Sequence, residues 1–398
     1  MRSSERIHWL LSAVVFNFIL GIAFAKRLWL SDRSYPLTPF FHALIGLPVW
    51  LDYILTPALI LMLLMSAIGP KPKKYLIFSL VLIAFLFLQD QGRLLPSFYE
   101  YSFLLLLIPF YIPGRSNEED AGNGDAILNT CRFAIACIYA WSGIQKMNPL
   151  FVNDFSWFLA PVTNLLPFIA ALLPVLLIVA PLIELSIGLG LIFKRTRKFA
   201  LVAVLAMHAS IFLLIGPVRG NWNDSAWAWN LGSALIVFVL FFRADDIPAR
   251  AIAFNDKFWG YWVVLLFFGF LPALSLFNLW DSPLSFDVYS GNYFQAQIYV
   301  SEALKSRLSA DIARYAVGPV GSSTAAVEPI DLYGWAEAEF NANPYPVPRI
   351  LENVGGSLCA YAASPSEVDL AIRDKLHLSG GFHWVGGLQS YDCSTLNR

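Results

Sequence analysis

The sequence predicts an all-α polytopic membrane bundle of about nine transmembrane helices, followed by a small extracytoplasmic domain of α or α+β type. Composition is the first basis for this prediction: of 398 residues, 57% are hydrophobic and only 14% are charged, and the mean hydropathy is +0.59. Soluble domains carry about a quarter charged residues, so this chain has too little polar surface for a water-soluble globule. A formal net charge of −1 offers no basic field for nucleic acid.

The second basis is a series of apolar runs, since a helix needs roughly 20 apolar residues to cross the hydrocarbon core. The sixth run contains Pro167, Pro174 and Pro181, which predict a kink or a re-entrant piece. The third and fourth runs are short, which suits tilted helices or helices buried behind their neighbours. The nine runs lie near 8–25, 48–68, 75–90, 98–113, 129–147, 167–193, 199–216, 226–242 and 258–280.

The third basis is a break in charge near residue 280. Residues 1–280 carry 20 Lys and Arg against 15 Asp and Glu, whereas residues 281–398 carry 7 against 13. We therefore predict a transmembrane domain over 1–280 and a soluble domain over 281–398, which is long enough to hold its own core.

The positive-inside rule predicts the orientation in a cell (inner) membrane. Fourteen basic residues, including those of the loops 71–74 and 194–198, fall on one side of a nine-span path, and six fall on the other. The N-terminus is therefore expected in the cytoplasm and the C-terminal domain outside. Residues 1–25 also suit a cleaved signal peptide, and this alternative leaves the remaining topology unchanged.

The cysteines divide between the two predicted domains. Cys131 and Cys137 fall within the fifth run and are expected to pack there. Cys359 and Cys393 lie in the domain expected to face an oxidising compartment, which predicts a disulfide between them. No metal site is expected, because the sequence holds no zinc-binding motif.

Three polar clusters are predicted to share the outer side of the membrane, at 89–101, 139–148 and 219–224. The first contains Asp90 and Arg93, and the second contains Tyr139 and Trp141. We expect Asp90 and Arg93 to serve as polar partners in an outward-facing cavity. Tyr139 and Trp141 are expected to form an aromatic wall there, or alternatively part of an interfacial belt.

Two ionisable residues lie deeper within the runs, Glu184 in the sixth and His208 in the seventh. Such groups are costly in hydrocarbon and normally face a bundle interior with a partner. Their positions on consecutive antiparallel helices permit a carboxylate–imidazole hydrogen bond. Alternatively, each is satisfied separately by backbone or by a hydroxyl such as that of Ser186.

Lys146, in the second polar cluster, also has two interpretations. A lysine at the end of a membrane helix commonly snorkels to the interface. A lysine desolvated in an apolar pocket can instead act as a base at neutral pH.

The segment around Lys146 resembles the vitamin K-dependent gamma-carboxylase and its bacterial relatives, the horizontally transferred transmembrane (HTTM) proteins. The resemblance rests on Gly143, Ile144, Lys146, Met147 and Asn148, and extends over a core of about 75–280. DoxX-like membrane proteins share a looser version of the same pattern. In that core, Glu184 and His208 fall on segments similar to the later helices of the family.

The resemblance implies that Lys146 is the base that deprotonates a quinol, with a quinone or quinol as cofactor. We expect Lys146 to act as this base or as an anion anchor, with Glu184 and His208 as buried support. Glutamate carboxylation itself is not expected. The histidine of the family's first polar stretch is absent here, and its large external domain is replaced by residues 281–398.

The leading hypothesis is a membrane protein whose outward-facing cavity binds or acts on a lipophilic, quinone-like molecule. The alternative is a non-enzymatic membrane scaffold whose residues 281–398 bind a partner protein. The sequence leaves open whether the protein is an enzyme.

Overall fold

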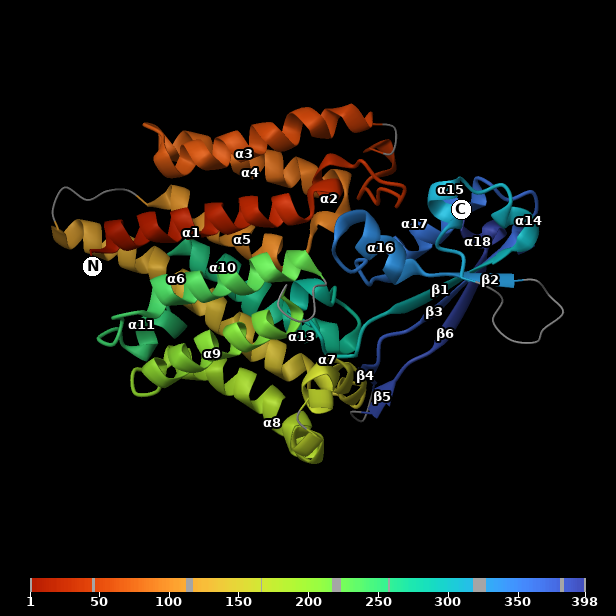
Figure 1. Ribbon diagram of the computed structural model, residues 1–398. Helices are drawn as coiled ribbons and strands as arrows, with labels where there is room; N and C mark the ends of the chain where they lie inside the picture. The colour runs from red at the N-terminus through yellow and green to blue at the C-terminus, as the bar shows by residue number, and fades with distance from the viewer. Residues whose placement is uncertain are drawn as a thin grey trace. The chain divides into compact units, whose positions relative to one another are not determined.

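The computed structural model describes residues 2–44, 47–111, 117–165, 167–216, 223–256, 258–317, 327–379 and 383–396. These residues pack into two compact units (Figure 1). The helical unit contains Met1–Phe24, Pro57–Ile83 and Leu95–Asn292, and the mixed unit contains Ala25–Thr56, Ala84–Leu94 and Tyr293–Arg398. The mixed unit thus combines the C-terminal segment with two segments from the first third of the chain.

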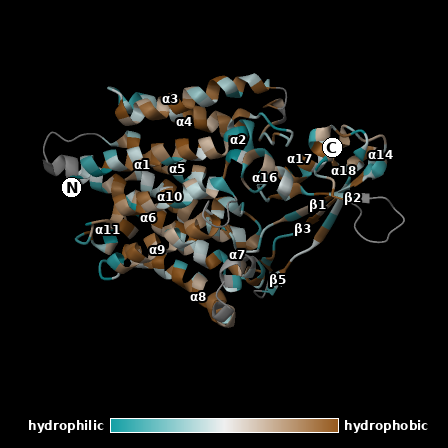
Figure 2. Ribbon diagram, in the orientation of Figure 1, coloured by the Kyte–Doolittle hydropathy of each residue, from teal (hydrophilic) through white to brown (hydrophobic). Residues whose placement is uncertain are grey.

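Eight helices among the described residues are long and apolar enough to cross a membrane. Their hydrophobic composition is visible along the bundle in Figure 2. A multi-pass membrane protein is thereby confirmed. The helices are α1 (Ser3–Phe24), the run Val49–Ile68 that includes α3 (Asp52–Ile68), α4 (Pro72–Gln89), α6 (Asn117–Gln145), α8 (Pro167–Ile192), α9 (Arg197–Ile215), α10 (Asp224–Phe241) and the run Trp259–Phe277.

The prediction of nine spans is wrong at the fourth position, residues 98–113. There the chain forms α5 (Pro96–Leu107), a helix of 12 residues, and a short 3-10 turn, η4 (Ile108–Phe110). At 1.5 Å per residue α5 is about 18 Å long, well below the hydrocarbon thickness. Most of its side chains are buried. Because α5 is covered by protein, it does not need the length of a lipid-facing span.

The last span is the least regular. It begins as α12 (Trp259–Val264), widens into a π-helical stretch, η5 (Leu265–Phe270), and continues as α13 (Leu271–Leu274) and η6 (Ser275–Phe277). Pro272 is the second residue after the π-helical stretch and supplies no backbone N–H, which accounts for the altered hydrogen bonding there. Shorter helices α7 (Phe151–Leu165) and α11 (Ala249–Ala253) connect neighbouring spans.

Helices α6 and α8 approach each other through glycines. A Cβ atom at Gly143 of α6 would lie 2.6 Å from the Pro181 carbonyl oxygen and 2.5 Å from the Leu185 amide nitrogen of α8. A Cβ atom at Gly188 of α8 would likewise lie 2.5 Å from the Ala140 amide nitrogen of α6. The two backbones are therefore in direct contact, as small residues permit between membrane helices. Pro174 and Pro181 both lie inside α8, which continues through them as a single helix.

Buried arginines satisfy the carbonyl groups left over at helix C-termini. Arg6 of α1 donates to the Val239 and Leu240 carbonyls at the end of α10, and Arg132 of α6 also donates to Leu240. Arg197 donates to Leu191 at the end of α8. These three residues belong to the basic set that predicts the cytoplasmic side, and that orientation remains a prediction.

The mixed unit contains a four-stranded antiparallel sheet in the order β2-β1-β3-β6. The strands are β1 (Gln295–Ser301), β2 (Val327–Ile330), β3 (Val368–Arg373) and β6 (Leu388–Asp392), and β4 (His377–Ser379) pairs with β5 (His383–Val385) as a separate hairpin. Alternate residues of β3 are buried, including Leu370 and Ile372. Helix α17 (Pro348–Cys359) packs against β3, and α16 (Leu332–Phe340) packs against β1. The C-terminal region is therefore of α+β type.

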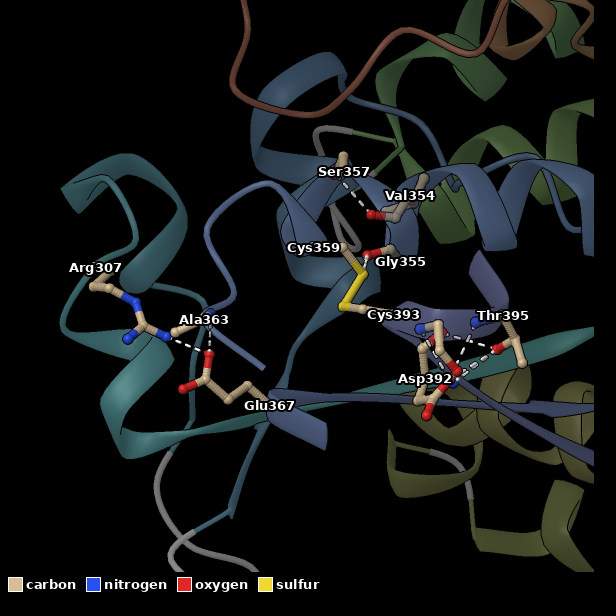
Figure 3. The surroundings of a disulfide bond; sticks show 11 residues. Arg307, Val354, Gly355, Ser357, Cys359, Ala363, Glu367, Asp392, Cys393 and Thr395 are labelled. Atoms are coloured by element: carbon tan, nitrogen blue, oxygen red, sulfur yellow. Dashed lines mark hydrogen bonds and ion pairs between the residues drawn. A yellow bond between two sulfur atoms is a disulfide. The ribbon is translucent and has the colours of Figure 1, made fainter. Parts of the chain in front are cut away.

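A disulfide joins Cys359, at the end of α17, to Cys393, at the start of α18 (Cys393–Leu396), across 34 positions of sequence (Figure 3). Asp392 caps α18 by accepting from the Ser394 and Thr395 amides. The bond ties the helix layer of the mixed unit to the strand that ends at Asp392.

We predict that Gly143→Ala destabilises the helical unit by about 1–3 kcal/mol, because the new methyl group meets backbone atoms that cannot move aside. Gly122→Ala is the matched control, since it lies on the same helix with no atom within 4 Å of its Cβ position. Thermal unfolding in detergent should show a lower Tm for Gly143→Ala only. Equal Tm values for the two variants would contradict the close packing of α6 and α8.

We predict that Cys359 and Cys393 are disulfide-bonded in protein isolated from native membranes, as measured by mass spectrometry without reduction. Closing a loop of this length contributes about 3–4 kcal/mol, so the double variant Cys359→Ser/Cys393→Ser should unfold at lower urea concentration. Cys137→Ala in the helical unit is the control and should leave the unfolding of the mixed unit unchanged. Recovery of Cys359 and Cys393 as free thiols would argue against an oxidising compartment.

Candidate functional site

A cavity of about 410 Å³ lies within the helical unit. Its walls come from α5, α6, α7, α8, α9 and α10 and from the segment 286–289 after the last span. Apolar side chains such as Ile135, Phe151 and Met207 make up most of the lining. Several ionisable side chains interrupt this apolar surface, a combination typical of small-molecule sites.

The first polar group in the cavity is an ion pair between Lys146 and Glu184. The Lys146 ammonium donates to Glu184 Oε2 at 2.8 Å and to Ser142 Oγ at 2.7 Å. Lys146 is 8% exposed, so its side chain extends into the cavity wall and does not snorkel away from it.

The close contact of α6 and α8 positions this ion pair. Ser142 and Lys146 are four residues apart and therefore share one face of the chain at the end of α6. Gly143, next to Ser142, touches the turn of α8 between Pro181 and Leu185, and Glu184 lies in that turn. The absence of a side chain at Gly143 brings the two backbones near enough for Lys146 to reach Glu184.

His208 forms the second polar group, with Tyr139 and Asn230. The Tyr139 hydroxyl lies 2.6 Å from His208 Nε2, and Asn230 Oδ1 lies 2.9 Å from His208 Nδ1. Because the Asn230 amide nitrogen donates to the Ala226 carbonyl, its oxygen faces the imidazole, so Nδ1 carries the hydrogen. Nε2 then accepts from Tyr139. Glu184 and His208 therefore do not bond to each other. Glu184 pairs with Lys146, and His208 contacts Tyr139 and Asn230.

Glu100 of α5 provides a second carboxylate in the cavity. Its Oε2 accepts from Trp229 Nε1 at 2.9 Å, and its residue is 1% exposed. Its Oε1 has no hydrogen-bond partner among the described residues.

Sequence reasoning missed Glu100, Asn230 and Trp229 as site residues. Glu100 lies in the first polar cluster, and the signal that could have identified it is a carboxylate within the apolar run that follows Pro96. Asn230 is likewise an isolated amide within the apolar run of α10. Both resemble ordinary polar interruptions until the tertiary structure places them beside Tyr139 and His208.

Asp90 and Arg93 belong to the mixed unit and are not among the residues that line the cavity. Asp90 pairs with Arg33 at 2.5 Å, and Arg93 pairs with Asp52 at 2.6 Å; all four side chains are almost wholly buried. Burial by itself would raise the pKa of the Asp90 carboxyl. The positive charges of Arg33 and Arg93 lower the pKa by more than burial raises it, so the pKa of Asp90 lies below its ordinary value. The network joins the loops 31–38 and 90–93 to the start of α3.

The remaining predicted residues have local partners. Trp141 Nε1 donates to the Gly269 carbonyl at 3.1 Å, and Trp141 does not line the cavity. Residues 219–222 of the third polar cluster lie outside the described residues. Asn223 of that cluster caps α10 by accepting from the Ala226 amide. Within the described part of the chain, no group of three or more His, Cys, Asp or Glu residues is placed to hold a metal ion.

Comparison with known proteins gives one family match. The model of the family described as methylamine utilisation protein MauE matches residues 124–226, roughly a quarter of the chain. No curated protein and no solved structure matches. The match overturns the resemblance to the gamma-carboxylase and HTTM proteins, which rested on a short motif around Lys146, and it gives no support to the DoxX-like relationship. The part of the chain that is similar to the MauE family contains Tyr139, Lys146, Glu184 and His208.

Proposed function

We propose that the helical unit binds a lipophilic small molecule in its cavity and holds the polar end of that molecule at the Lys146–Glu184 pair. The observation that carries the proposal is a charged pair at the wall of a mainly apolar cavity within membrane-spanning helices. Burying two charges in such surroundings is costly, and a structural role alone could be met by apolar residues of similar volume. A ligand that uses the charges explains why they are present.

Lys146 acts in this proposal as a hydrogen-bond donor to the ligand. This role takes the place of the role as a base that the sequence suggested. Its ammonium already donates to Glu184 and Ser142. Removing its proton would leave the Glu184 carboxylate without a counter-ion in apolar surroundings. A ligand oxygen beside the pair would instead receive a charge-assisted hydrogen bond, which is stronger than a neutral one.

The cavity suits a ligand with more than one polar atom. The Lys146–Glu184 pair supplies one hydrogen-bonding position, and the unpartnered oxygen of Glu100 supplies another. Phe151, Phe155 and Trp229 offer aromatic surface to a flat ring. A quinone-like head group suits the first position, because its oxygen accepts from Lys146 in both the quinone and the quinol form, and a quinol hydroxyl can also donate to the Glu100 oxygen. Such a molecule is the first probe to use, and this choice rests on the cavity alone.

The family match supports the same location. Residues 124–226 include most of α6, the residue Lys146 that directly follows it, and all of α8 and α9, which carry Glu184 and His208. The competing hypothesis is a membrane scaffold whose residues 281–398 bind a partner protein. It requires no ligand in the helical unit, so the experiment below separates the two.

We predict that Lys146→Met weakens binding of a decyl-substituted benzoquinone by about 10–100-fold, the value of one hydrogen bond to a charged group. Binding is measured by titration of the purified protein in detergent, and lipophiles that co-purify are quantified by mass spectrometry. Lys194→Met is the control, because Lys194 is exposed in a loop and lies outside the cavity.

A single substitution can also destabilise the protein by leaving Glu184 unpaired. The double variant Lys146→Met/Glu184→Met removes both charges and should recover the wild-type Tm while remaining defective in binding. Equal binding and equal lipophile content in wild type, double variant and control would refute the proposal and favour the scaffold.

A further inference from the structure

The cavity of the helical unit reaches the protein surface on one side. Its exposed lining residues are Ile183 of α8 and Ala206 and Ser210 of α9. The lining residues contributed by α5, α6, α7, α10 and the segment 286–289 are buried or half-buried. The opening therefore lies between α8 and α9.

The packing of α8 and α9 explains the opening. The two helices are joined by the short turn at 193–196, and near it a Cβ atom at Gly190 would lie 3.0 Å from Ala200 Cβ. Arg197 reinforces this end by donating to the Leu191 and Ile192 carbonyls. Farther from the turn, both helices contribute residues to the lining of the cavity.

Small side chains line the α9 side of this opening, where Ala203, Ala206 and Ser210 are three and four residues apart on one face of the helix. On the α8 side, Ala180 lies one turn from Ile183 and Glu184. The route from the opening to the Lys146–Glu184 pair is therefore bordered by short side chains and ends at the proposed polar site.

Apolar side chains are exposed on α8 and α9 near the lining residues of the opening. Leu182 of α8 is 47% exposed, and Val202 and Leu213 of α9 are 66% and 57% exposed. Both helices are among the membrane spans, so these side chains face the hydrocarbon of the bilayer. The opening consequently leads into lipid.

We propose that the ligand is a membrane-dissolved amphiphile that enters sideways from the bilayer between α8 and α9. Its apolar chain lies in the opening bordered by Ala203, Ala206 and Ser210, and its polar end reaches Lys146 and Glu184. This inference rests on the proposed function, and it specifies the ligand class and the direction of entry.

The test uses the full-length protein in nanodiscs whose phospholipids carry a photoactivatable diazirine on the acyl chain. After irradiation, mass spectrometry maps the cross-linked residues. Wild-type protein should carry adducts on the buried lining residues Tyr139 and Phe151. In Ala206→Trp the indole obstructs the opening, and these inner adducts should be lost while adducts on lipid-facing residues persist.

Val202→Trp is the matched control, because Val202 lies on the same helix and is exposed but does not line the cavity. It should keep the inner adducts. Ser210→Trp repeats the obstruction at an independent position, so misfolding of one variant, detected by its Tm, leaves the test intact. Inner adducts that persist in both obstructed variants would overturn sideways entry.

Lys146→Met separates this inference from the proposed function. Inner adducts that depend on Lys146 but not on Ala206 would retain the proposed function and overturn sideways entry. Inner adducts that depend on Ala206 but not on Lys146 would retain sideways entry and overturn the polar site. If wild type shows no inner adducts, benzoquinone titration in detergent decides: Lys146-dependent binding overturns only the entry route, and no binding overturns both.

Discussion

The direct backbone contact between α6 and α8 is the constraint on which the candidate site depends. Gly143 meets the carbonyl of Pro181 and the amide of Leu185, and Gly188 meets the turn that contains Ala136 and Ala140. Between helices in a membrane there is little hydrophobic driving force, so association relies on close packing and polar contacts. Here the close packing also determines the polar contact, because it brings Lys146 within hydrogen-bonding distance of Glu184.

Buried charge serves two different purposes in this protein. In the mixed unit, Asp52, Asp90, Arg33 and Arg93 neutralise one another with side chains almost wholly excluded from solvent, and they join loops that are distant in sequence. In the helical unit, Lys146 and Glu184 are also paired, but they border a cavity that contains a second carboxylate. The residues of the first arrangement are not among those that line the cavity, whereas Lys146 and Glu184 lie in its wall. This difference distinguishes a structural network from a candidate site.

Much of the architecture was predictable because it follows from local properties. Eight of the nine apolar runs coincide with membrane-length helices, and the described residues of the fourth run form the short and mostly buried helix α5. Lys146 and Glu184 were candidate site residues because they are ionisable residues that interrupt apolar runs. The sequence did not predict that they pair with each other. For Glu184 the sequence left open a hydrogen bond to His208 or a separate partner, and Asp90 and Arg93 were expected as polar partners in the cavity. Both expectations assumed that residues at a similar depth meet, and depth alone does not specify the rotation of one helix against another.

The sequence by itself determined that this is a multi-pass membrane protein with a distinct acidic C-terminal segment, because hydropathy and charge are summed along the chain and need no tertiary contact. Only the tertiary structure decided which polar groups share a cavity. Glu100 and Asn230 are isolated polar residues in apolar helices, and they join Tyr139 and His208 because α5, α6, α9 and α10 turn these positions toward one another. Hydrogen bonds are directional and short, so their partners depend on the rotation and separation of packed helices, and these are set by contacts such as that at Gly143.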